Sequence, residues 1–256
     1  MIIARGLVAL LLIPFVGFLH FLLAIQFEIY ERRPTWGLIV ILASLFVLAR
    51  LLIRAGRNRK ALLILNIFAW FLATALIWWV EVYSQYSPLE TSYLAGQKIN
   101  LSIHEGLEDG GGNSIKLETL INKAQYTLLT FYRGHWWPYC VTELVKLDKQ
   151  SDQLESLGVQ VFAVSTDQAE DSQKVESKTS GNVTFIYDPR GKFIDSLGLL
   201  DKGGNPFNGS DVARISKMLV NKKQELLWFR FTENNRVRTP SKELISELKK
   251  AVKNYK

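Results

Sequence analysis

The first third of the chain is a series of long apolar segments separated by short charged ones. Three runs consist mostly of Leu, Ile, Val, Phe and Ala, at residues 6–27, 35–53 and 61–80. About 20 apolar residues in succession allow an α-helix to cross a hydrocarbon layer roughly 30 Å thick. The pattern therefore predicts three transmembrane helices. Three such runs in series do not fit the buried helical core of a water-soluble protein.

The first of these runs contains two residues that are unusual in a membrane span, Pro14 and His20. A proline is tolerated there where neighbouring helices compensate for the lost backbone hydrogen bond. A histidine in such a place is either packed between helices or part of a functional site. The sequence leaves both interpretations of His20 open.

Shorter apolar runs alternate with amphipathic segments from residue 126 onward. Three of these runs predict buried strands, at 126–132, 159–164 and 183–187. Segments with helical spacing or high polarity predict helices, at 139–157, 168–177, 192–199 and 240–252. Two further runs on either side of a polar turn predict a β-hairpin, at 215–220 and 225–231. This order predicts an α/β domain with one parallel strand–helix–strand unit.

Charge divides the chain in the same place as hydropathy. Residues 1–83 hold 8 of the 31 Lys and Arg but 3 of the 24 Asp and Glu, which leaves +5 there and +2 in residues 84–256. We therefore expect a membrane domain, 1–83, and a soluble domain, 84–256. A soluble domain with mixed charges and a net +2 provides no electrostatic case for nucleic-acid binding.

The distribution of basic residues predicts the orientation of the three spans. The loop between the second and third spans carries Arg54, Arg57, Arg59 and Lys60, with Arg50 just before it and no acidic residue. Loops rich in Lys and Arg stay in the cytoplasm. We therefore expect a multi-pass protein of the cytoplasmic membrane, with its N-terminus inside and residues 84–256 in the periplasm or outside the cell.

One segment between a predicted strand and a predicted helix carries the candidate chemistry. Residues 131–143 read FYRGHWWPYCVTE, and Cys140 is the only cysteine in the chain. The first turn of a helix favours the thiolate form, so the position predicts an exposed thiol with a lowered pKa. The plain alternative is an inert core cysteine. One cysteine and three histidines without ligand spacing, His20, His104 and His135, predict no metal site and no cofactor.

The spelling of this segment resembles the AhpC/TSA peroxiredoxins, which have a thioredoxin-like fold, and in particular a branch with the motif FYRGxWCPYC followed by Glu-Leu. The matching residues are Phe131, Tyr132, Arg133, Gly134, Trp136, Pro138, Tyr139, Cys140, Glu143 and Leu144. Trp137 stands where the branch has cysteine and more typical peroxiredoxins have threonine. Weaker likeness at 161–167, 183–191, 213–228 and 238–241 extends the resemblance to roughly residues 94–253.

The resemblance implies a catalytic role for Cys140 as the peroxidatic thiol, which attacks a peroxide and becomes a sulfenic acid. It implies that Arg214 lowers the pKa of this thiol and that Glu143, one helical turn along, assists. Trp136, Trp137, Pro138 and Tyr139 would line the substrate pocket. The hydroxyl that threonine supplies in the family has no counterpart in Trp137, whose only donor is its indole N–H.

Three functions follow as hypotheses. The first is a membrane-anchored peroxiredoxin-like thiol oxidoreductase that reduces peroxides through a single cysteine with an external thiol as reductant. The second is a thiol-exchange protein that forms mixed disulfides with a disulfide substrate. The third is a degenerate thioredoxin-fold domain that binds a partner at the membrane without catalysis. In all three, membrane lipid surrounds the spans.

Overall fold

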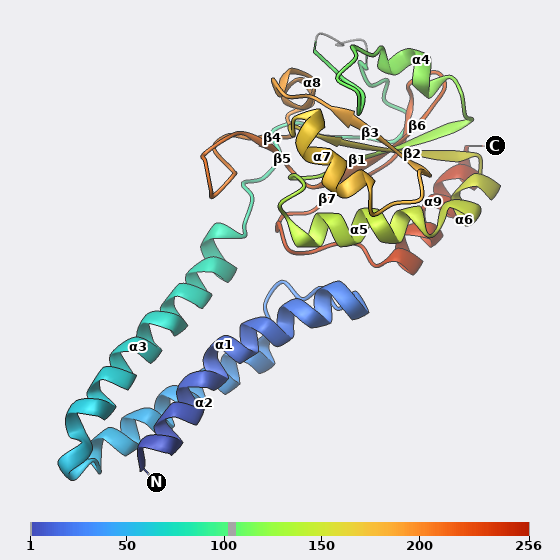
Figure 1. The fold of residues 1–256 in the computed structure, drawn as a ribbon. Coiled ribbons are helices and arrows are strands. Elements are labelled where there is room, and N and C mark those ends of the chain that lie inside the picture. The colour runs from blue at the N-terminus through green and yellow to red at the C-terminus, as the bar shows by residue number, and fades with distance from the viewer. Residues whose placement is uncertain (1, 102–105, 256) are drawn as a thin grey trace. The chain divides into compact units, whose positions relative to one another are not determined.

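The computed structural model describes residues 2–101 and 106–255, so that His104 lies outside the described residues. The chain forms two compact units, Met1–Gln85 and Tyr86–Lys256 (Figure 1). The first is helical, and the second is a mixed α/β domain.

The first unit contains α1 (Ile2–Phe27), α2 (Thr35–Ile53), the 3₁₀ turn η1 (Gly56–Asn58), α3 (Arg59–Trp78) and a short π-helix, η2 (Trp79–Tyr83). Its three helical segments are long and apolar enough to cross a membrane, which confirms the pattern predicted from the sequence. Small and apolar residues face inward, among them Ile13, Leu48, Leu62 and Ala69. Many large apolar side chains point outward instead, as expected where the surrounding solvent is lipid.

Close packing of α1 against α2 depends on a glycine. A Cβ at Gly37 would lie 2.6 Å from a methyl group of Val16, which is closer than carbon atoms can approach. Small residues at such a crossing let two helix backbones come together in a membrane. Pro14 lies within α1, which continues through it to Phe27.

The second unit is built on a five-stranded sheet with the order β3-β2-β1-β6-β7. Its strands are β1 (Tyr126–Phe131), β2 (Val159–Ser165), β3 (Val183–Tyr187), β6 (Ser216–Asn221) and β7 (Leu226–Phe231). The first three are parallel, β6 is antiparallel to β1, and β7 is antiparallel to β6. This is a thioredoxin-like sheet, and β1 lies at its centre.

Helices cover both faces of this sheet. The helices of the second unit are α4 (Leu117–Ile121), α5 (Pro138–Asp148), α6 (Ser151–Ser156), α7 (Ala169–Glu176), α8 (Lys192–Ser196) and α9 (Ser241–Asn254). Leu129 and Phe131 of β1 pack on one face in a core that includes residues of α4 and α8. Figure 1 shows α5, α6 and α9 on the opposite side. The central strand is therefore covered on both faces, which explains why every one of its residues is buried.

Two features differ from the sequence-based prediction. The helix predicted at 139–157 is two helices, α5 and α6, because the chain turns at Lys149 and Gln150 after a buried Asp148 whose carboxylate accepts from the backbone N–H groups of Ser180 and Asn182. A small second sheet pairs β4 (Leu200–Asp201) with β5 (Val212–Ala213). Two-residue strands are too short to show an alternating pattern, so the sequence does not reveal them.

Candidate active site around Cys140

The loop that carries the candidate motif runs from the end of β1 at Phe131 to the start of α5 at Pro138. Gly134 has φ 147°, and a Cβ there would lie 2.7 Å from both the Asp167 carboxylate and the Trp136 indole nitrogen, so the turn requires glycine. Pro138 occupies the first turn of α5, where its missing N–H costs nothing. Cys140 lies in that same turn, and its N–H donates to the carbonyl oxygen of Trp137 at 2.9 Å.

Cys140 is fully buried, with no exposed surface. The expectation of an exposed thiol is therefore wrong. The sulfur accepts a hydrogen bond from Nη2 of Arg238 at 3.2 Å and a second one from the backbone N–H of Arg133. A cationic donor and a backbone donor on one sulfur are the contacts that stabilise a thiolate.

Arg238 is held by a buried network that includes the predicted Glu143. Its Nε donates to Oε2 of Glu143 at 2.9 Å, and its Nη1 donates to the carbonyl oxygens of Asn235 and Val237 at 3.1 and 2.8 Å. The other carboxylate oxygen of Glu143 accepts from Nζ of Lys217 on β6. A planar guanidinium with this many fixed partners has one orientation. The network therefore presents its remaining N–H groups to Cys140.

Arg214, the arginine expected beside the thiol, lies elsewhere. Its Nη2 donates to Oγ of Ser87 at 3.0 Å and its Nη1 to the backbone carbonyl of the same residue at 3.3 Å. The guanidinium that contacts Cys140 is that of Arg238. The expected contact is thus corrected from Arg214 to Arg238.

Two members of the network were missed from the sequence, and each left a signal there. Lys217 interrupts the apolar strand 215–220, and a lysine buried to 3 % exposure requires a carboxylate partner. Arg238 begins the segment Arg-Thr-Pro-Ser before the last helix, which matched the family pattern. Neither signal says which distant residue the side chain reaches.

The electrostatics of the site disfavour the thiolate form of Cys140, which the expected chemistry requires. Burial raises the pKa of the Cys140 thiol above its ordinary value, and the charge of Glu143 adds to the rise. The Arg238 guanidinium and the two hydrogen bonds to the sulfur act in the other direction without overcoming it. The sequence-based expectation of a lowered pKa is therefore wrong for the buried Cys140 thiol.

Three of the four predicted pocket residues, Trp136, Trp137 and Tyr139, form an aromatic cluster, whereas Pro138 is exposed. Trp137 is 8 % exposed, and its indole N–H donates to the carbonyl oxygen of Asn235 at 3.0 Å. Its ring lies 5.5 Å from that of Trp136 and 5.7 Å from that of Tyr139, centre to centre. Because its one donor already has an acceptor, Trp137 does not replace the threonine hydroxyl.

The Arg133 side chain connects the motif loop to other segments of the second unit. Its guanidinium is 1 % exposed and donates to the Tyr86 hydroxyl at 2.8 Å, to the Asp201 carboxylate at 3.0 Å and to the Gly204 carbonyl. It also lies 5.7 and 5.8 Å from the ring centres of Trp136 and Trp137. Burial raises the pKa of Tyr86 to about 12, so this phenol stays protonated.

His135 is tied to the loop that follows β2. Its backbone N–H donates to one oxygen of the Asp167 carboxylate at 2.7 Å, and its ring Nδ1 lies 3.3 Å from the other. This arrangement fixes the motif loop to the neighbouring strand end. Among residues 2–101 and 106–255, no group of three His, Cys, Asp or Glu side chains forms a metal site.

The family model for the AhpC/TSA family matches residues 98–228, just over half of the chain. The chain belongs to the AhpC/TSA family. Curated relatives include a peroxiredoxin of Methanococcus vannielii, 29 % identical over 103 residues, which are 38 % of this chain and 46 % of the relative. A peroxiredoxin of Methanocaldococcus jannaschii is 26 % identical over 116 residues, 43 % of this chain and 52 % of the relative. The match thus spans about half the length of these AhpC/TSA relatives.

Solved peroxiredoxin structures share the fold of the second unit. Reduced Prx3 from Vibrio vulnificus in complex with hydrogen peroxide aligns with a TM-score of 0.52 at 17 % identity, over 62 % of this chain and 97 % of that one. Peroxiredoxin 6 of Arenicola marina aligns with a TM-score of 0.53 at 14 % identity, over 62 % and 73 % of the two chains. At these identities the likeness establishes the AhpC/TSA fold alone.

Proposed function

We propose that this protein is a membrane-anchored peroxiredoxin-like thiol oxidoreductase that works through the single thiol of Cys140. The observation that carries the proposal is the 3.2 Å contact between Nη2 of Arg238 and the sulfur of Cys140, within a network that fixes the guanidinium. The family membership supports a peroxide or a disulfide as the substrate.

The reaction uses the thiolate of Cys140. Its sulfur attacks one oxygen of a hydroperoxide, the O–O bond breaks, and the leaving oxygen takes up a proton to depart as water or an alcohol. Cys140 becomes a sulfenic acid. Because the chain has no second cysteine, an external thiol condenses with the sulfenic acid and releases water, and a second external thiol then frees Cys140 as an external disulfide is formed.

The charges of the network suit the ionised thiol. Arg238 and Lys217 are two cations, and Glu143 is one anion, so the buried group carries one excess positive charge when Cys140 is neutral. Ionisation of Cys140 brings the sum to zero. The network therefore offsets part of the cost of burying a thiolate, and any step that admits water to the sulfur weakens the opposing effect of burial.

We further propose that the three helices of the first unit anchor the protein in the cytoplasmic membrane with residues 84–256 on the outside. The basic loop that includes Arg54, Arg57 and Lys60 supports this orientation. A periplasm-active and a cytoplasm-active reporter, each fused after Ser84, test it. Activity of the periplasmic reporter alone is expected, and activity of the cytoplasmic reporter alone would overturn the orientation.

The decisive test is the oxidation of Cys140 in the full-length protein. Exposure to a low dose of hydrogen peroxide, followed by a sulfenic-acid trap and mass spectrometry, is expected to label Cys140. The Arg238→Gln variant is expected to react at least tenfold more slowly, because a charge-assisted donor is lost. Arg214→Gln is the matched control, since its side chain binds Ser87 instead. Equal rates for the two variants would remove the basis of the proposal.

One observation favours a second candidate, the partner-binding domain without catalysis. Cys140 has no exposed surface, and Trp137 is itself buried and hydrogen-bonded next to it. A peroxide reaches the sulfur only after neighbouring side chains move. If Cys140 resists both the sulfenic-acid trap and disulfide exchange with small thiols in the folded protein, the partner-binding function becomes the better description. Exchange without peroxide consumption would indicate the thiol-exchange protein.

A further inference from the structure

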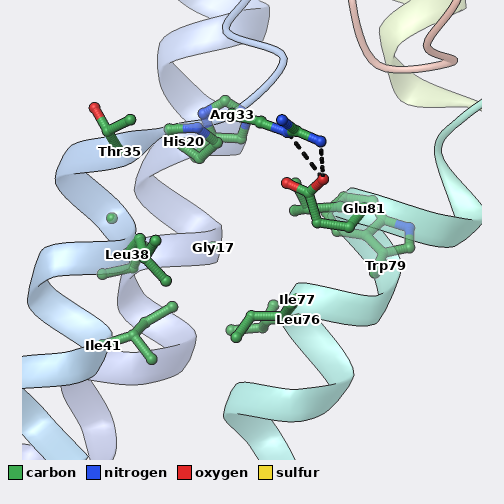
Figure 2. A pocket seen from close by; sticks show the side chains of 14 residues that line it. Gly17, His20, Arg33, Thr35, Leu38, Ile41, Leu76, Ile77, Trp79 and Glu81 are labelled. Atoms are coloured by element: carbon green, nitrogen blue, oxygen red, sulfur yellow. Dashed lines mark hydrogen bonds and ion pairs between the residues drawn. The ribbon is translucent and has the colours of Figure 1, made fainter.

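A cavity of about 260 Å³ lies within the first unit, between the second half of α1, the start of α2 and the end of α3 (Figure 2). Its walls are mostly apolar and include Val16, Leu38, Ile41, Leu76 and Ile77. An engineered cavity of about 150 Å³ with similar walls accepts a benzene ring. The cavity in the first unit therefore has room for a six-membered ring with several substituents.

One end of this cavity is polar. The guanidinium of Arg33 forms an ion pair with Glu81, with Nη2 and Nε at 2.7 and 2.9 Å from the same carboxylate oxygen, and both side chains line the cavity. His20 lines it as well and is 5 % exposed. Figure 2 shows His20 and the ion pair at one end and the side chains of Leu38, Ile41 and Leu76 further along. The cavity thus suits a molecule with a polar head and an apolar body.

The ion pair adds no net charge to the polar end, because Arg33 and Glu81 compensate each other. The two side chains are 67 % and 33 % exposed, so the pair is partly open to its surroundings. A neutral carbonyl group suits an end without net charge and accepts hydrogen bonds from N–H donors such as those of imidazole and guanidinium. Trp79, in the same helical segment as Glu81, is also in the lining.

Two further features support a binding site at this end of the bundle. Trp79 and Glu81 belong to the π-helix η2, and single π-helical turns within α-helices occur frequently at functional sites. Leu38 and Ile77 at the cavity wall are 45 % and 42 % exposed, so the cavity is open along this part of its wall. An apolar tail can therefore leave the cavity between α2 and α3 and continue into the lipid.

We propose that this cavity binds a prenylated quinone, with a ring carbonyl at the end formed by His20, Arg33 and Glu81 and the isoprenoid tail in the bilayer. Among bilayer-soluble molecules, this class combines a neutral flat head, carbonyl acceptors and a long apolar tail. The proposal requires that the three helices lie in a membrane. It does not depend on the chemistry of Cys140.

The test uses the full-length protein in lipid nanodiscs and a decyl-substituted benzoquinone as the probe, with quenching of tryptophan fluorescence as the readout. Saturable binding is expected. His20→Leu should weaken it about tenfold, the effect of one lost hydrogen bond. Leu38→Trp should block the cavity and abolish saturation. Leu42→Trp is the matched control, because Leu42 is 55 % exposed on the same helix and lies outside the lining.

Several results would overturn the proposal. One is quenching that rises linearly without saturation, as for a quinone merely dissolved in the lipid. Another is equal affinity in wild type, His20→Leu and Leu38→Trp. Displacement of the probe by a ringless alkyl chain of equal length in the wild-type protein would show a general lipid groove. This last comparison needs no variant, so the proposal stays testable even where a substitution prevents folding.

Discussion

The guanidinium of Arg238 donates to the sulfur of Cys140 at 3.2 Å across 98 positions of sequence. The same guanidinium binds Glu143, which lies one helical turn from Cys140 on α5. Cys140 and Glu143 thus share one arginine, so the charge on either group affects the other.

The reactivity of Cys140 should keep rising with pH beyond the ordinary thiol pKa of about 8.5, because burial raises its pKa. Arg238→Gln should shift the curve further upward, since the stabilising cation is lost. Alkylation rates of the folded protein between pH 6 and 11 measure this. Arg214→Gln should leave the curve unchanged. A wild-type midpoint well below 8.5 would contradict a raised pKa of the Cys140 thiol.

The stability of the second unit should also depend on pH, because the pKa of Cys140 is raised in the folded state. A group whose pKa is higher in the folded than in the unfolded state stabilises the fold below its unfolded pKa and loses that contribution as pH rises through the folded pKa. For Cys140 the contribution should therefore fall above about pH 8.5. Cys140→Ala should show a flatter stability curve in that range. Urea unfolding of both proteins at a series of pH values gives the difference.

Glu143→Gln should destabilise the second unit by about 3–5 kcal/mol, because it leaves Arg238 and Lys217 as buried cations without their shared carboxylate. Adding Lys217→Met should recover part of the loss, since one unpaired charge is then removed. Chemical unfolding of the single and double variants measures the coupling. If the double variant is less stable than Glu143→Gln alone, the pairing of these charges is not what stabilises the site.

Trp137→Thr should increase the rate of Cys140 with peroxide by a factor of about 10² to 10³, the value of one restored donor at a reacting oxygen. The smaller side chain also opens a path to the buried sulfur, and the lost packing should lower stability by about 3–5 kcal/mol. Stopped-flow peroxide consumption measures the rate. Trp136→Thr is the control, because it removes a neighbouring ring without restoring the missing hydroxyl. A separate variant, Trp137→Cys, recreates the Cys-Pro-Tyr-Cys pair and should favour disulfide exchange.

The fragment 86–256 should fold in water without the helices of the first unit. Its core brings together residues of the sheet, α4 and α8, including Leu129, Phe162 and Ile186. Cooperative unfolding and dispersed amide resonances are expected. A molten or insoluble fragment in several buffers would show that the second unit needs the membrane part.

Local patterns in the sequence determined much of the architecture. The three long apolar helices follow from uninterrupted apolar runs, and the strand predicted at 183–187 coincides with β3, because hydrophobic periodicity is a property of neighbouring residues. The place of Cys140 in the first turn of a helix also follows locally, from a strand, a glycine turn and Pro138. These features need no knowledge of distant contacts.

Only the tertiary structure decided the chemistry around the thiol. The sequence pointed to Arg214 as the partner of Cys140, but the course of the chain after β7 brings Arg238 to the thiol, while Arg214 meets Ser87. The surroundings of the Cys140 sulfur depend likewise on a distant part of the chain, the segment before α9 that carries Arg238. A helix terminus favours a thiolate through its local dipole, whereas burial acts through every element packed around the sulfur. The first effect can be predicted from a short segment, and the second requires the whole fold.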